Sequence, residues 1–131
     1  MLHGRIHTAH PVYYVQDLVG SLRFYRDRLG LAVDWTMPEQ KLAEIRLNGG
    51  ATIVVCENGT KPAGASAPVL VFNIDDVDAA YARLRAGGVT FESEPSDEFY
   101  ARAVVLRDAD GYRLCLVSPR RRADDPQICN R

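Results

Sequence analysis

The chain has 131 residues, which is enough for one domain or two closely joined half-domains. Its composition is typical of a globular protein, with 47% hydrophobic and 25% charged residues. The 16 Lys and Arg residues nearly balance the 17 Asp and Glu residues, and the net charge is −1. This balance provides no basic surface for nucleic acid or an anionic membrane, so we expect neither as a partner.

The three cysteines indicate a reducing compartment. Cys56, Cys115 and Cys129 form no Cys-x-x-Cys pair, and their odd number argues against a disulfide framework. The first residues contain no apolar stretch typical of a secretory signal, and no apolar run approaches the length of a membrane span. We therefore expect a cytoplasmic protein.

The first half of the chain predicts one strand, one helix and three further strands. Apolar residues recur at helical spacing after Asp17, which is a plausible N-cap, and Gly30 stands where the helix would end. The tripeptide 48–50 (NGG) is typical of a hairpin turn between the last two strands. The expected elements are a strand at 10–15, a helix at 17–29, and strands at 32–37, 42–47 and 51–56.

The same order of elements returns after a segment rich in Gly, Pro and Ala, which we interpret as a linker at 58–68. The expected elements are a strand at 69–74, a helix at 76–86, and strands at 89–92, 102–107 and 112–117. Asp17 aligns with Asp76 at an offset of 59 residues, and Gly30 aligns with Gly88 at an offset of 58. This pattern predicts a duplicated unit, with the coincidence of two ordinary α+β stretches as the alternative.

Residues 10–18 (HPVYYVQDL) and 108–117 (DADGYRLCLV) open and close this repeat. Together with Ser21 and the residues around Tyr25 and Gly30, they resemble the vicinal oxygen chelate superfamily. This chain has Ala109 where the closing turn of that superfamily usually has a proline. That superfamily includes glyoxalase I, extradiol dioxygenases, fosfomycin-resistance thiol transferases and bleomycin-resistance proteins. The resemblance extends over roughly residues 6–118.

The resemblance implies an α+β fold of two βαβββ modules that form a cup-shaped mixed sheet. We expect modules at about 6–57 and 69–118 in a single domain, 1–118, and pairing of two chains in a homodimer. The tail 119–131 is expected to be flexible. Its arginines at 120–122 are interpreted as a solvated charge run, with contact to an anionic partner as the alternative.

The resemblance also implies where a metal ion would bind. Of the four ligand positions of the metal-dependent members, His10 matches, but the others fall at Val54, Val69 and Cys115. Valine has no donor atom, and Glu57 is at odd spacing from Val54, so it should point to the opposite face of its strand unless a bulge shifts it. We therefore expect no metal and no cofactor, with His10 as a family remnant or a pocket wall.

Strand alternation predicts which residues line a small-molecule cavity. Exposed aromatic residues are added to this set, because a flat ligand would stack on their rings. For Trp35, ordinary packing is the alternative. The predicted ligand-binding residues are His10, Val12, Tyr14, Trp35, Val54, Asn73, Phe99, Tyr100, Arg102 and Cys115, and no catalytic residue is predicted.

The expected function is metal-independent binding and sequestration of an antibiotic or other aromatic natural product, which confers drug resistance. One alternative is a metal-dependent, glyoxalase-like lyase, isomerase or dioxygenase that uses His10 and further ligands. Another is a non-catalytic interaction module that uses its dimer surface.

Overall fold

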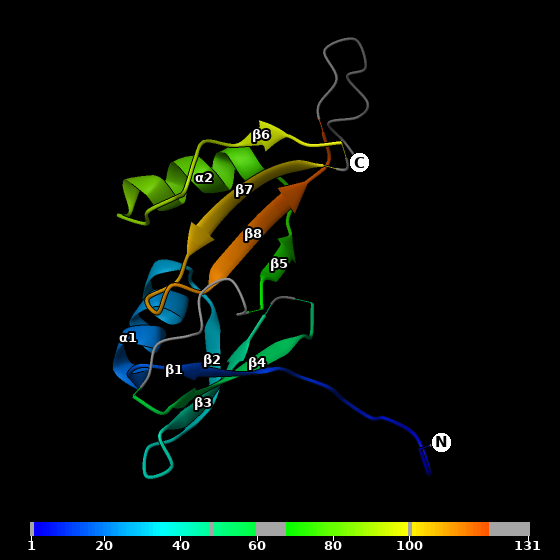
Figure 1. Cartoon of the computed structure of the whole chain (residues 1–131), viewed down its shortest axis with the longest axis vertical. Coiled ribbons are helices and arrows are strands. Elements are labelled where there is room, and N and C mark those ends of the chain that lie inside the picture. Colours follow the sequence, from blue (N-terminus) through cyan, green and yellow to red (C-terminus); the bar gives the residue numbers. More distant parts are fainter. Residues whose placement is uncertain (1, 48, 60–67, 100, 121–131) are drawn as a thin grey trace. The chain divides into compact units, whose positions relative to one another are not determined.

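A computed structural model of the chain describes residues 2–47, 49–59, 68–99 and 101–120 (Figure 1). The chain divides into two compact units, Met1–Lys61 and Pro62–Arg131. Each unit holds a four-stranded mixed sheet and a helical segment, which confirms the predicted α+β class. Tyr100, most of the expected linker and the expected tail from residue 121 onward lie outside the described residues.

The first unit begins with a strand and a helical segment and continues with three strands. Strand β1 runs parallel to β4, while β3 is antiparallel to both β4 and β2, so the strand order is β1-β4-β3-β2. The turn between β3 and β4 uses Gly49 and Gly50 at φ values of 92° and 90°, a backbone region that favours glycine. The elements are β1 (Val12–Val15), α1 (Leu18–Leu22), η1 (Arg23–Arg28), β2 (Ala32–Met37), β3 (Leu42–Arg46) and β4 (Thr52–Glu57).

The second unit repeats this connectivity. Its first strand again pairs in parallel with its last, and the strand order is β5-β8-β7-β6. The two units therefore share one strand topology, as the repeat in the sequence predicted. The elements are β5 (Leu70–Asn73), α2 (Val77–Ala86), β6 (Ser96–Asp97), β7 (Arg102–Arg107) and β8 (Arg113–Ser118).

The predicted strand at 89–92 is wrong. In this segment Phe91 forms a single isolated bridge with Leu106, and the strand that pairs with β7 is instead β6. Glu92 N still donates to Val105 O at 3.0 Å, so the segment touches one end of β7, but the pairing stops before Pro95 and resumes at β6. Proline has no N–H to donate to a ladder, which explains the interruption.

Both helices begin with the same pair of caps. The side chains of Asp17 and Asp76 accept hydrogen bonds from backbone N–H groups within the first turn of their helices. A residue at the end of the unit's last strand adds a second cap: Glu57 Oε1 accepts from Leu18 N at 2.8 Å, and Ser118 Oγ accepts from Val77 N at 3.1 Å. Each last strand is thus fastened to the start of its own helix.

The predicted single α-helix at 17–29 is corrected to an α-helix that continues as a six-residue π-helix, η1. The cause is one additional residue. Leu31 N donates to Tyr25 O at 3.0 Å, six residues back, whereas the equivalent bond of α2 joins Val89 N to Leu84 O, five residues back, also at 3.0 Å. The same additional residue in the first helix explains why the repeat offset changes from 59 to 58. The wider turn of the π-helix accommodates it.

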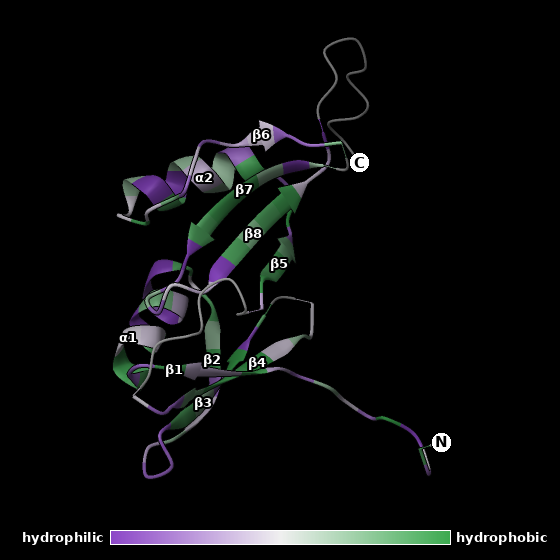
Figure 2. Cartoon of the chain, viewed as in Figure 1, coloured by the Kyte–Doolittle hydropathy of each residue, from purple (hydrophilic) through white to green (hydrophobic). Residues whose placement is uncertain are grey.

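The core of each unit lies between its helix and one face of its sheet. In Figure 2 the hydrophobic colouring runs along β7 and β8. The fully buried strand residues alternate along the chain, which places them on one face, and they include Val15, Ala43, Ile45, Ile53, Val55, Leu106 and Leu114. None of the helices in the described part of the chain is long and apolar enough to cross a membrane.

Candidate functional site

Each sheet has a second face that points away from its helix, which we call open face 1 in the first unit and open face 2 in the second. Cap contacts fix the assignment, because Glu57 and Ser118 reach their helices from the helix side of β4 and β8. In β1, Tyr13 and Val15 are buried on the helix side, while Val12 and Tyr14 are 47% and 53% exposed. This alternation is the one that the sequence predicted.

Open face 1 carries a row of four side chains, one from each strand. Val12 lies opposite Val54, Val54 lies opposite Glu44, and Glu44 lies opposite Trp35. A second row of mostly apolar residues runs beside it through Tyr14, Cys56, Leu42 and Met37. The two rows together form an apolar surface with one carboxylate in it.

A β-bulge brings Trp35 onto this face. In the β2–β3 pairing, Val33 lies opposite Ile45 and Trp35 lies opposite Glu44, which leaves Asp34 as an extra residue. In a regular pairing Asp34 would lie opposite Glu44, and Trp35 would fall opposite Ala43 on the helix side, because alternate residues of a strand point to opposite faces. The bulge also frees Asp34 to bind Arg46 Nε at 2.9 Å.

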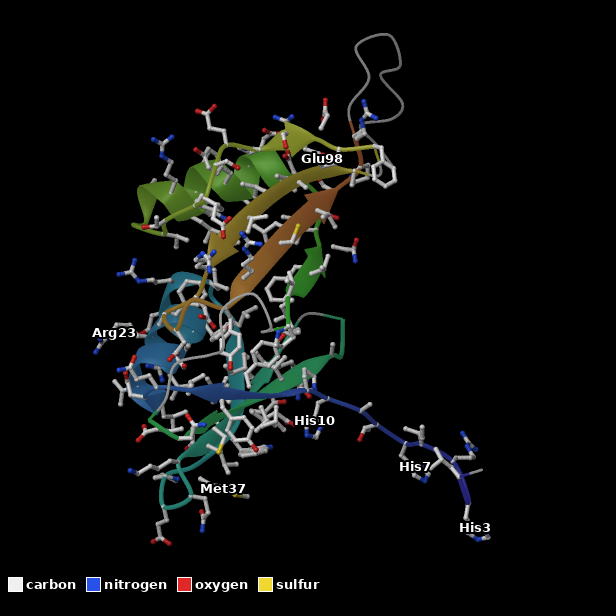
Figure 3. All side chains as sticks on the ribbon, viewed as in Figure 1. His3, His7, His10, Arg23, Met37 and Glu98 are labelled. Atoms are coloured by element: carbon white, nitrogen blue, oxygen red, sulfur yellow. The ribbon has the colours of Figure 1, made fainter. Side chains whose placement is uncertain are left out.

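His10 lies two residues before β1 and is exposed. The neighbouring Pro11 carbonyl accepts a hydrogen bond from Val54 N at 3.0 Å, so His10 stands at the end of open face 1 nearest Val54. Figure 3 shows His3, His7 and His10 at separate places along the N-terminal segment. The histidines of the chain therefore do not converge on a point.

Open face 2 brings together several of the predicted residues of the second unit. Val71 lies opposite Cys115, and Cys115 lies opposite Val105, while Asn73 lies opposite Val117 in the next row. Burial raises the pKa of the Cys115 thiol, and the nearby charge of Glu98 raises it further. Phe99 is 92% exposed in the loop before β7, beyond the paired strands of this face.

Arg102 lies on the helix side of its sheet and does not join open face 2. It pairs with Ser118, and its guanidinium binds the Asp78 carboxylate of α2 through Nε at 3.1 Å and Nη2 at 2.9 Å. The hydrogen bonds and the charge of Asp78 raise the pKa of the Arg102 guanidinium, and Asp97 makes a smaller contribution. Arg102, on β7, therefore links this strand to α2 through Asp78 and to β6 through Asp97.

The residues at the family's metal positions do not fit a metal ion. Val54 and Val69 have no donor atom, which leaves His10 and Cys115, and two side chains are fewer than a metal site uses. The β1–β4 register is regular, so no bulge turns Glu57 toward open face 1, and its carboxylate is held by Leu18 N and Lys41. No group of three or more His, Cys, Asp or Glu suited to a metal ion occurs among the residues described.

Sequence reasoning missed Glu44, the one charged member of the row through Trp35. The signal was present, because the buried residues Ala43 and Ile45 alternate with Glu44 and Arg46 in β3. Applying the alternation to this strand would have placed Glu44 on the same face as Val54.

Comparisons with known proteins agree with this architecture. The family model of the glyoxalase/bleomycin resistance protein/dioxygenase superfamily matches residues 7–116. The uncharacterized protein YraH of Bacillus subtilis (strain 168) is 33% identical over 109 residues, which cover 73% of this chain and 85% of that protein.

Two solved structures place this fold among both binding proteins and enzymes. TnmS3, an antibiotic binding protein from Streptomyces sp. CB03234, is 26% identical with a TM-score of 0.74, over 90% of this chain and 100% of that one. A lactoylglutathione lyase from Agrobacterium tumefaciens shares the fold at 21% identity and a TM-score of 0.69, over 88% of this chain and 96% of that one. With its two repeated sheet-and-helix units and the matching family model, the chain belongs to the glyoxalase/bleomycin resistance protein/dioxygenase superfamily.

Proposed function

We propose that the protein binds an antibiotic or other aromatic natural product without a metal ion and confers resistance by sequestering it. The observation that carries this proposal is the row on open face 1. It has a valine where the metal-dependent relatives have a ligand, and it has Trp35 two strands away on the same face. An apolar wall with a few polar groups is typical of small-molecule sites.

The aromatic nature of the ligand follows from the exposed side chains. Trp35 is 36% exposed and Met37 is 48% exposed on neighbouring rows of open face 1. An indole ring with an accessible face stacks on flat ligands at a small cost in conformational entropy. The likeness to the antibiotic binding protein TnmS3 supports the same class of ligand.

Calorimetric titration of the full chain with a panel of planar aromatic antibiotics tests the proposal. We expect stoichiometric binding without conversion of the ligand, and we expect Trp35→Ala to weaken it about tenfold, or about 1.4 kcal/mol. Val19→Ala is the matched control, because Val19 is 65% exposed on α1, on the other side of the sheet. Unchanged affinity in Trp35→Ala and in Phe99→Ala would contradict the proposal.

The proposal includes two properties of the whole protein. The chain pairs as a homodimer, as the family resemblance implies, and sedimentation of the purified protein tests this. It acts in the cytoplasm, where the free thiols of Cys56 and Cys115 stay reduced.

A further inference from the structure

Glu44 is a half-buried carboxylate in the middle of an apolar surface. It lies on the central strand β3, with Val54 opposite on one side and Trp35 opposite on the other. Directly opposed residues of neighbouring strands have Cβ atoms about 4.5–5.5 Å apart. A ring stacked on Trp35 therefore brings its substituents within reach of the Glu44 carboxylate.

The two cations nearest to Glu44 in the sequence form ion pairs with other carboxylates. Lys41 Nζ lies 3.3 Å from Glu57 Oε2, and Arg46 Nε lies 2.9 Å from Asp34 Oδ1. Within the described part of the chain, Glu44 itself has no hydrogen bond or ion pair. The fold thus leaves one carboxylate on this face to interact with solvent or with a ligand.

A ligand that covers this carboxylate must provide it with a partner. Covering an ionised carboxylate with a neutral ring removes its water without replacing its hydrogen bonds, which opposes binding. A protonated amine or amidine on the ring restores those bonds as charge-assisted ones. The same residue therefore favours cationic ligands and disfavours neutral and anionic ones.

We propose that Glu44 is a specificity-determining residue that selects aromatic ligands bearing a cationic group next to the ring on Trp35. This inference rests on the proposed function, because it names the chemistry of the ligand at that same site. The bulge at Asp34 contributes by setting the indole directly opposite the carboxylate.

The test uses three probes with one ring skeleton: aminoacridine, which is a cation at neutral pH, acridine, which is neutral in mildly basic buffer, and acridine carboxylate, an anion. Trp35 is the only tryptophan of the chain, so its fluorescence reports binding at this face. We expect the wild type to bind aminoacridine about tenfold more tightly than acridine. In Glu44→Gln this preference falls to within about twofold, with acridine affinity kept or increased.

Glu39→Gln is the matched control, because Glu39 is exposed in the turn between β2 and β3 and its change removes the same charge. It should keep the wild-type preference for the cation. If the probes bind but show no preference, or Glu44→Gln keeps the preference, this inference is wrong and the proposed function stands. If no probe binds at Trp35 in the wild type or in Glu44→Gln, the proposed function fails and this inference fails with it.

Discussion

Glu57 shows how a single side chain ties the first unit together. Its carboxylate accepts a hydrogen bond from Leu18 N and pairs with Lys41, and these contacts lower its pKa from the ordinary 4.5, the backbone hydrogen bond most strongly. A negative charge at the start of α1 is also favoured by the helix dipole. The charge of Glu57 therefore stabilises the folded state.

Glu57→Gln should lower the melting temperature at neutral pH by a few degrees, because the amide keeps an acceptor but loses the charge. The stabilisation by the charge is complete above the ordinary pKa of 4.5 and is lost as the pH falls through the lowered pKa of the folded state. The difference in melting temperature between wild type and variant should accordingly shrink in acid. Thermal melts across a pH series measure this.

The control for this measurement is Glu39→Gln, which removes a charge from an exposed turn. Its melting temperature should follow the wild type at every pH. A Glu57→Gln deficit that stays constant from neutral to acidic pH would mean that the charge contributes nothing.

At the scale of single residues, the sequence predicted which side of a strand a residue takes but not what it contacts. Val12, Tyr14 and Val54 were assigned to the open face from simple alternation, and the paired registers agree with that assignment. Arg102 was predicted to bind the ligand, whereas its guanidinium binds Asp78 of α2 on the helix side of the sheet. Long polar side chains find partners through tertiary contacts that spacing along the chain does not encode.

The π-helix η1 makes a prediction at the scale of an element. If it exists only to accommodate one extra residue, deletion of Asp27 should convert it to α-helix and leave the bond between Leu31 N and Tyr25 O spanning five residues, as in α2. Asp27 is exposed, and within the described part of the chain it forms an ion pair with its neighbour Arg26, an exposed pair that contributes little. We expect a folded protein whose melting temperature changes by a few degrees.

Deletion of Ala82 from α2 is the matched comparison, because Ala82 is also exposed but α2 has no residue to spare. It should turn Tyr81 and Leu84 out of phase with each other on the helix face and lower the melting temperature several times more. Circular dichroism melts of both deletions measure the difference. Equal losses would mean that the π-helix is required by its packing.

The elements that the sequence predicted well are those whose signals are local. The strands at 32–37 and 102–107 were predicted with the observed bounds, and Asp17 is the helix cap that was predicted. The strand at 89–92 was wrong because only Phe91 and Glu92 contact β7, and regular pairing resumes only at β6. How far an edge segment pairs with its neighbour depends on residues distant in the sequence, here Val105 and Leu106, and is not visible in a pattern of alternation.

At the scale of the whole molecule, the repeat separates what the two units share from what distinguishes them. Both units have the same strand order, and in both a side chain at the end of the last strand caps the start of the helix. We interpret these shared features as requirements of the fold. The open faces differ: the first carries Trp35 and Glu44, and the second carries Val71 and Cys115. We expect the residues of the open faces to determine the function, because the shared fold does not constrain which side chains they carry.

This division gives a prediction about metal content, which separates a binding protein from a metal-dependent enzyme of the same fold. Val54 and Val69 provide no donor atoms, which leaves His10 and Cys115 as the only fitting residues of the four positions. Two side chains at most do not hold a divalent ion against water and a chelating wash. The full chain, incubated with Fe(II), Ni(II), Mn(II) or Zn(II) and then washed, should retain far less than one ion per chain.

Elemental analysis of the washed protein measures this, with His10→Ala as the comparison and His3→Ala as the control for weak binding by the N-terminal segment. Equal, near-zero metal in all three proteins is the expected result. Near-stoichiometric metal that is lost in His10→Ala but kept in His3→Ala would mean that other side chains complete a site around His10. The transfer of the family positions to Val54, Val69 and Cys115 would then be out of register, and an enzymatic function would replace sequestration.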